Sequence, residues 1–269
     1  MIELQSPVSD LRLALVQSDL EWQAAERNRE LLQLQMQKLQ GKCDIIILPE
    51  MFTSAFATGS GAIAESHPGT TLAWMLELSR SLDAAITGSI AVIVDGQKYN
   101  RLLFVTPDGG SHTYDKVHLF RMLGEDKRYS AGKSRLMLNF RGWKIFPIVC
   151  YDLRFPVFCR STRQQAWDLM ICVANWPATR NTHWRTLLQA RAIENLGFVA
   201  GVNRTGRDGN DLDYIGHSAV ISPMGVEQLQ AGNEQGVFTT TVSAAALAAW
   251  RRQFPAWMDA DEFELLDCK

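Results

Sequence analysis

A short apolar run at residues 143–149 ends abruptly at Cys150, and this change constrains the fold more than any other feature of the chain. The run has the length and composition of a buried strand. Residues 151–156 are polar, aromatic or Pro, so Cys150 is expected at the carboxyl end of that strand, the edge where open α/β sheets place their chemistry. Free cysteine is also among the residue types most often buried as a small hydrophobe. On this segment alone, a catalytic role and a packing role for Cys150 are equally favoured.

The rest of the chain alternates strands with helices. Turn residues and apolar runs predict strands at residues 11–17, 44–48, 84–94, 99–106, 112–115, 169–174, 198–203, 216–222 and 236–242. The same signals predict helices at residues 22–40, 70–82 and 182–196, with Thr70-Thr71 as a cap and Gly41 as a stop. Residues 204–213 are expected to form a polar loop. This order indicates an α/β fold with a mixed sheet, or two packed sheets, flanked by helices.

Composition excludes several classes of function. The 269 residues, 46% of them hydrophobic, are enough for one large domain, and we expect a single domain over residues 1–269. The net charge of −2 gives no basic field for nucleic acid or an anionic membrane, so a small-molecule substrate is expected. Five scattered cysteines without a CxxC pair, and no leader or membrane-spanning run, predict a cytoplasmic protein.

Three predicted strand ends carry reactive groups: Glu50 after Ile-Ile-Ile-Leu-Pro, Lys116 in Tyr-Asp-Lys-Val-His-Leu, and Cys150 before Tyr-Asp-Leu-Arg-Phe. In this order and context they resemble the signature of the nitrilase, or carbon-nitrogen hydrolase, superfamily. The likeness extends over nearly the whole chain, from these motifs to residues 254–261. It implies a four-layer α-β-β-α sandwich, no cofactor, and a homodimer.

The resemblance also implies a role for each reactive group. Cys150 attacks an amide carbonyl, Glu50 accepts the thiol proton and returns it to the leaving amine, and water then hydrolyses the thioester. Lys116 and the backbone N–H of Tyr151 stabilise the oxyanion. Glu125, which by itself would be taken for a solvated loop carboxylate, corresponds to a second glutamate that keeps Lys116 charged.

Residues near these motifs are candidates for substrate binding. Arg154 is suited to gripping a carboxylate through two N–H groups, although holding Asp152 or a backbone turn is an equally favoured role. Phe52, Phe120 and Trp176 are expected as apolar walls, with core packing as the alternative. No HxxH or HExxH pair exists, so no metal site is predicted, and His118 is expected to be structural.

Within the superfamily, residues 119–125 and 255–261 most resemble bacterial omega-amidases. This likeness implies hydrolysis of the terminal amide of 2-oxoglutaramate, or a related ω-amide of a 2-oxo acid, with release of ammonia. Deaminated glutathione amidase and carbamoyl-amine hydrolase are the alternatives within the superfamily. A catalytically silent dimeric binding module and a thiol redox sensor are the alternatives outside it.

Overall fold

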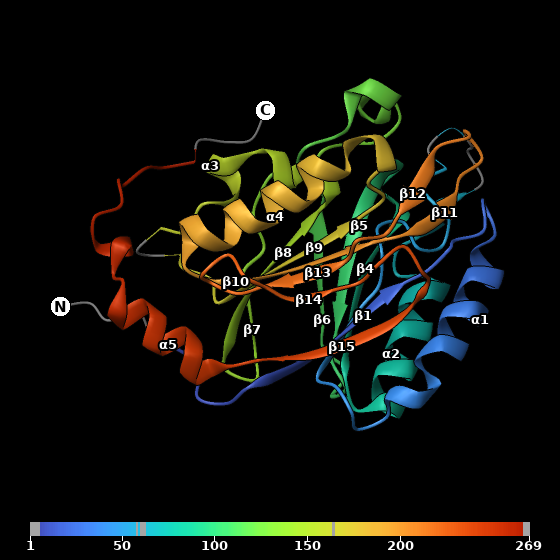
Figure 1. The fold of residues 1–269 in the computed structure, drawn as a ribbon. Helices are drawn as coiled ribbons and strands as arrows, with labels where there is room; N and C mark the ends of the chain where they lie inside the picture. Colours follow the sequence, from blue (N-terminus) through green and yellow to red (C-terminus); the bar gives the residue numbers. More distant parts are fainter. Residues whose placement is uncertain (1–5, 58, 60–62, 163–164, 266–269) are drawn as a thin grey trace.

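The computed structural model describes residues 6–57, 59, 63–162 and 165–265. Two β-sheets pack face to face, and helices cover their outer faces, so the layers run α-β-β-α (Figure 1). This arrangement confirms the expected four-layer sandwich. Of the two alternatives left open by the order of the elements, the structure has two packed sheets.

The first sheet has the order β15-β1-β2-β4-β5-β6, with β3 paired to β4. Its strands are β1 (Leu11–Gln17), β2 (Ile45–Ile47), β3 (Glu65–Ser66), β4 (Ala85–Val94), β5 (Gln97–Val105), β6 (Ser111–Asp115) and β15 (Gly236–Val242). Helices α1 (Ala25–Met36) and α2 (Thr70–Leu82) cover its outer face (Figure 1).

The second sheet has the order β14-β13-β10-β9-β8-β7. Its strands are β7 (Leu138–Phe140), β8 (Trp143–Val149), β9 (Leu169–Ala174), β10 (Phe198–Asn203), β13 (Ala219–Ile221) and β14 (Glu227–Gln230). Helices α3 (Pro156–Cys159) and α4 (Asn181–Asn195) lie over this sheet, and α5 (Ala244–Gln253) follows β15 (Figure 1).

Strand β1 shows why both faces of the first sheet are apolar. Leu13 and Leu15 belong to the core cluster that includes the second sheet, whereas Ala14 and Val16 pack in the cluster that includes Leu32 of α1. Alternate residues of a strand point to opposite faces, so an uninterrupted apolar run fits a strand covered on both sides. Five of the predicted strands, at residues 11–17, 143–149, 169–174, 198–203 and 236–242, have the bounds observed in the structure.

Other predicted elements differ in extent. The helix expected from residue 22 begins at Ala25, and a 3₁₀ turn, Gln37–Leu39, continues it toward Gly41. The prediction that Thr70 or Thr71 caps α2 was wrong. Gly69 is the cap residue, and the backbone N–H of Thr71 donates instead to the Glu65 carboxylate at 3.1 Å.

The segments around residues 204–222 were also predicted imperfectly. The expected loop at 204–213 contains a short strand, β11 (Thr205–Arg207), and ends where a second one, β12 (Asp213–Ile215), begins; the two strands pair as a separate two-stranded sheet. The strand expected from residue 216 begins only at Ala219, because Gly216 has a φ of 63° and lies against the Gln17 amide. A Cβ at Gly216 would come within 2.2 Å of that amide, so the local turn requires glycine.

Candidate active site

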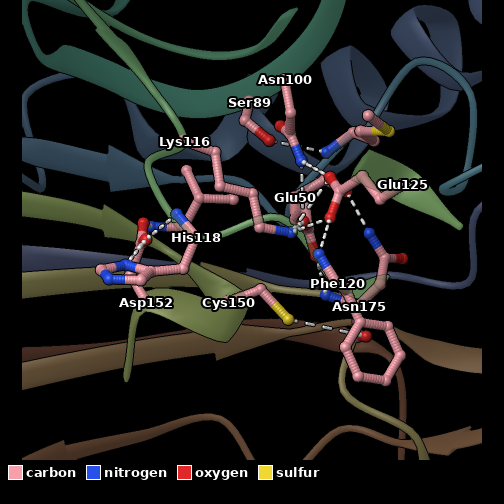
Figure 2. Close-up of polar contacts among 12 residues, drawn as sticks. Glu50, Ser89, Asn100, Lys116, His118, Phe120, Glu125, Cys150, Asp152 and Asn175 are labelled. Carbon is pink, nitrogen blue, oxygen red and sulfur yellow. Dashed lines mark hydrogen bonds and ion pairs between the residues drawn. The ribbon is translucent and has the colours of Figure 1, made fainter. Parts of the chain in front are cut away.

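The ends of three strands bring Glu50, Lys116 and Cys150 together between the two sheets (Figure 2). Glu50 follows β2 by three residues, Lys116 follows β6 directly, and both strands belong to the first sheet. Cys150 follows β8 of the second sheet directly. The sandwich therefore places one reactive group of the second sheet against two of the first.

Cys150 begins a 3₁₀ turn, Cys150–Arg154, and its backbone has a φ of 45°. Such a left-handed conformation is uncommon for a residue with a side chain and is concentrated at functional sites. The side chain is half-buried, lines a pocket, and has its Sγ 3.8 Å from the Asn175 carbonyl oxygen. Burial and the negative charge of Glu50 raise the pKa of the Cys150 thiol well above its ordinary value, and the Lys116 charge opposes them.

The carboxylate of Glu50 is fully buried and accepts hydrogen bonds on both oxygens. Its Oε1 accepts from Lys116 Nζ at 2.8 Å and from Asn100 Nδ2 at 2.8 Å. Its Oε2 accepts from the backbone N–H of Asn175 at 2.8 Å, and the Asn175 side chain donates to the Glu50 carbonyl at 2.6 Å. These donors satisfy a buried charge that would otherwise be costly, and they fix its orientation.

Lys116 lies between two carboxylates. Its Nζ is 2.8 Å from Glu50 Oε1 and 2.9 Å from Glu125 Oε2, and all three side chains are fully buried. Burial alone would lower the pKa of Lys116, but the charges of Glu125 and Glu50 outweigh it and raise that pKa well above its usual value. The ammonium is therefore charged at neutral pH, as an oxyanion donor must be.

Glu125, the residue that sequence alone would assign to a solvated loop, is buried at this centre. Its Oε2 accepts from the backbone N–H of Phe120 at 2.6 Å, in addition to Lys116. Burial raises the pKa of Glu125, the Lys116 charge lowers it, and the Glu50 charge raises it again. Figure 2 shows the Lys116 ammonium in contact with both carboxylates.

The turn that carries Cys150 is held by Asp152. This buried carboxylate accepts from the backbone N–H of Val149 at 3.0 Å and from the Tyr114 hydroxyl at 2.7 Å. His118, expected to be structural, contributes its backbone N–H to the same carboxylate and stacks on Phe155. The backbone of Tyr151, the expected oxyanion donor, lies within this turn directly after Cys150.

A pocket opens onto Cys150 and Lys116. Three predicted substrate-binding residues, Phe120, Arg154 and Trp176, line it, as does Tyr151. Arg154 lies with its guanidinium 4.6 Å from the Trp176 ring and with Nη2 3.2 Å from His183 Nδ1. The alternative role of Arg154, to hold Asp152, is wrong, because the Asp152 carboxylate accepts its hydrogen bonds from other residues.

Phe52 does not line this pocket. Its ring is fully buried in the core beneath α2, 6.1 Å from the Trp74 ring and against Gly88 of β4. Positive φ values at Met51 and Phe56 turn the chain after Glu50, and it is Phe56 whose ring lies in the pocket, 5.3 Å from Lys116 Nζ. The prediction that Phe52 forms an apolar wall of the pocket was therefore wrong; Phe56, four residues later, has that position.

Sequence reasoning missed several residues of the site. Asn100 and Asn175 contact Glu50, and Tyr214 of β12 lines the pocket. Arg180 also lines the pocket, with its guanidinium 5.5 Å from the Phe120 ring. Asn100 lies between Lys98 and Arg101 in the polar first half of β5, so the sequence gives no signal that sets it apart.

Other candidate groups lie away from this centre. Cys159 and Cys172 are buried in the core, as predicted, and Cys268 lies outside the described residues. Within the described ranges, no group of three His, Cys, Asp or Glu side chains is arranged to hold a metal ion. No helix in the same part of the chain is long and apolar enough to span a membrane.

Comparison with known proteins gives consistent matches. The family model for carbon-nitrogen hydrolases matches residues 12–252. Omega-amidase YafV of Escherichia coli (strain K12) is 44% identical over 256 residues, covering 95% of this chain and 98% of the relative. The 2-oxoglutaramate amidase of Bacillus subtilis (strain 168) is 28% identical over 250 residues, covering 92% and 96%. A solved CN-hydrolase superfamily protein from Xanthomonas campestris, with an arsenic adduct in its active site, is 48% identical with a TM-score of 0.93, covering 96% and 100%.

Proposed function

The chain belongs to the carbon-nitrogen hydrolase family, and on that basis we propose that it is an omega-amidase that hydrolyses the terminal amide of 2-oxoglutaramate or a related ω-amide of a 2-oxo acid. The observation that carries this proposal is the contact between Lys116 and the two carboxylates beside Cys150, at the floor of a pocket that also holds two arginines.

In the proposed reaction, Cys150 attacks the amide carbon while Glu50 takes the thiol proton. Because burial keeps the thiol protonated at neutral pH, this transfer has to accompany the attack. The carbonyl oxygen gains negative charge, which the Lys116 ammonium and the Tyr151 backbone N–H stabilise. The carbon–nitrogen bond breaks as Glu50 returns the proton, so ammonia leaves and a thioester to Cys150 remains.

The second half of the reaction restores the enzyme. Water attacks the thioester carbon while Glu50 accepts a proton from it, and the thiol leaves with that proton. The net change is one water consumed for one ammonia and one carboxylate produced. Glu125 stays an acceptor throughout: it holds the Lys116 ammonium and the Phe120 backbone in place.

Arg154 and Arg180 support a substrate that carries a carboxylate. Both guanidiniums lie in the pocket wall, and in the described part of the chain neither is paired with an Asp or Glu. Burial lowers the pKa of Arg154, and the positive charge of Arg180 acts in the same direction. A substrate carboxylate would relieve the repulsion between two neighbouring cations and accept their fork-like donors.

The expectations of one domain over residues 1–269 and of a homodimer stay predictions.

The test is the release of ammonia and of the 2-oxo dicarboxylate from 2-oxoglutaramate. Deaminated glutathione, a carbamoyl amine and a neutral aliphatic amide are assayed beside it. We expect 2-oxoglutaramate to give the highest kcat/KM and Cys150→Ala to give none. Turnover by Cys150→Ala would contradict the thioester route, and faster turnover of deaminated glutathione would reassign the substrate.

A further inference from the structure

Asn100 contacts all three charged residues of the active site. Its side-chain Nδ2 donates to Glu50 Oε1 at 2.8 Å and to Glu125 Oε1 at 3.2 Å. Its backbone carbonyl accepts from the backbone N–H of Lys116 at 2.9 Å. Figure 2 shows its side chain beside both carboxylates. The residue lies in β5 and is 1% exposed, so its contacts are made in the absence of bulk water.

The two carboxylate oxygens that Asn100 contacts are already shared with the lysine. Glu50 Oε1 and Glu125 Oε1 also accept from Lys116 Nζ, at 2.8 and 3.2 Å. Two carboxyl groups and one ammonium share a buried site, where each further hydrogen-bond donor has a large effect. The amide of Asn100 is a donor that reaches both carboxylates without adding charge.

The orientation of the Asn100 amide is set by these carboxylates. A rotation that exchanged its nitrogen and oxygen would place Oδ1 against two acceptor oxygens. In the orientation observed, Oδ1 is buried and has no hydrogen-bond partner in the described part of the chain. A buried amide oxygen without a hydrogen-bond partner costs free energy of folding. The two hydrogen bonds that the N–H₂ group donates to the carboxylates explain why the amide is kept in this orientation.

We infer that Asn100 is a positioning residue that holds Glu50 as an anionic base beside Cys150 and keeps Glu50, Glu125 and Lys116 in a fixed arrangement. This inference rests on the proposed amide hydrolysis through Cys150. Asn100 acts through the carboxylates and has no role in contacting substrate.

The charged and titratable groups around this arrangement come from several elements. Lys116 follows β6 and Cys150 begins the turn after β8. The backbone N–H of Tyr129 donates to the Glu125 carbonyl at 2.9 Å, and the charge of Arg128 acts on Tyr129. On β5 itself, the neighbouring residues Tyr99 and Arg101 point to the opposite face, as strand alternation requires. Asn100 is thus a neutral side chain that donates to both carboxylates among ionisable neighbours.

The main test replaces the amide with an apolar side chain of similar size, Asn100→Leu, and with a smaller polar one, Asn100→Ser. The control is Thr87→Val in β4, because the Thr87 hydroxyl is equally buried and has no partner in the part of the chain that the structure describes. All proteins are first compared by thermal unfolding and circular dichroism.

We expect kcat for 2-oxoglutaramate to fall roughly 10- to 100-fold in both Asn100 variants, with KM changed less than about twofold, since a hydrogen bond to a charged group is lost. The acidic limb of the pH profile of kcat/KM should move to higher pH, because the carboxylate pair then binds a proton more readily. Thr87→Val should change neither. If Asn100 had a purely structural role, its variants would unfold at a lower temperature. Their acidic pH limb and their kcat per folded molecule would then equal those of the wild type.

Alkylation of Cys150 by iodoacetamide, followed by peptide mass mapping, separates this inference from the proposed substrate. Attack by the thiol depends on the same base, so its acidic limb should shift in Asn100→Leu and Asn100→Ser even if 2-oxoglutaramate is not hydrolysed. That result would reject the substrate and retain the positioning role. Folded variants with unshifted alkylation and hydrolysis profiles would overturn the inference.

Discussion

His118 contacts the Asp152 carboxylate twice, through its backbone N–H at 2.9 Å and its ring nitrogen Nδ1 at 2.8 Å, both to Oδ1. His118 lies two residues after Lys116, and Asp152 lies two residues after Cys150. This pair therefore joins the segment that carries Lys116 to the segment that carries Cys150, across the interface between the two sheets. We expect the position of the Lys116 ammonium relative to the Cys150 thiol to depend on this contact.

Asp152→Asn should loosen this connection. The new amide N–H₂ group would face the donors Val149 N–H and Tyr114 O–H, so we expect the free energy of unfolding to fall by about 2 to 4 kcal/mol. The rate constant kcat should fall as well, because Cys150 is no longer held. Urea titration and steady-state kinetics measure the two effects. Asp95→Asn, in the exposed β4–β5 turn where Asn is equally suited, is the control and should behave like the wild type.

Lys116→Met should remove the oxyanion donor and lower kcat/KM by about 10²- to 10³-fold. It should also leave Glu50 and Glu125 facing each other without a cation, which we expect to destabilise the fold by about 3 to 5 kcal/mol. Since the Lys116 charge lowers the pKa of the Cys150 thiol, its loss raises that pKa, and less thiolate exists at any given pH. Alkylation of Cys150 should accordingly need higher pH. Alkylation at unchanged or lower pH would show that Lys116 does not act on the thiol.

Lys116→Arg keeps the positive charge. Compared with Lys116→Met, we expect it to restore more of the free energy of unfolding than of kcat/KM.

Arg180→Ala should weaken binding of an anionic substrate more than of a neutral one. The pocket loses one of two guanidiniums, so KM for 2-oxoglutaramate should rise about 10-fold or more while kcat changes little. The kcat/KM for a neutral aliphatic amide, measured in the same preparation, serves as the internal control. Equal losses for both substrates would show that Arg180 shapes the pocket without recognising the carboxylate.

Asp44 should make the fold sensitive to acid. Burial alone would raise the pKa of Asp44, but hydrogen bonds from Arg12 and the charge of Arg141 lower it below its ordinary value. A depressed carboxyl pKa contributes stability that is present above the unfolded-state pKa, near 4, and is lost as pH falls through the folded-state value. Asp44→Asn should therefore be less stable than the wild type by about 1 to 3 kcal/mol at pH 7, and the difference should shrink toward acid pH. Urea unfolding at several pH values measures it, and a constant difference would contradict this account.

The positions of Glu50 and Cys150 were predictable because each follows a short apolar run, and the carboxyl ends of such strands are where open α/β sheets place reactive groups. Lys116 follows β6, a strand of mixed composition whose first three residues are exposed, and its motif indicated it instead. The length of each run fixed the residue at that edge to within a few positions. Their order and context then indicated the family.

Residues outside those runs were harder to place. Asn100 looks like any polar residue of a half-exposed strand until the second sheet covers that face. Arg180 lies in a 3₁₀ turn whose direction depends on packing around Trp176. Phe52 and Phe56 differ in position only because of left-handed residues between Glu50 and Ala57, and composition does not indicate such dihedral angles.

The left-handed backbone conformation at Cys150 lowers the stability of the fold at a position where the proposed activity requires a side chain. A residue with a Cβ loses about 1 to 2 kcal/mol in that conformation, whereas glycine adopts it freely. Selection for folding alone would favour glycine at position 150, and selection for turnover requires a thiol. The conformational cost is accepted because the tight turn presents the sulfur to the pocket. A substitution of Cys150 by glycine is therefore expected to raise the thermal stability, but only in a protein that no longer catalyses the reaction.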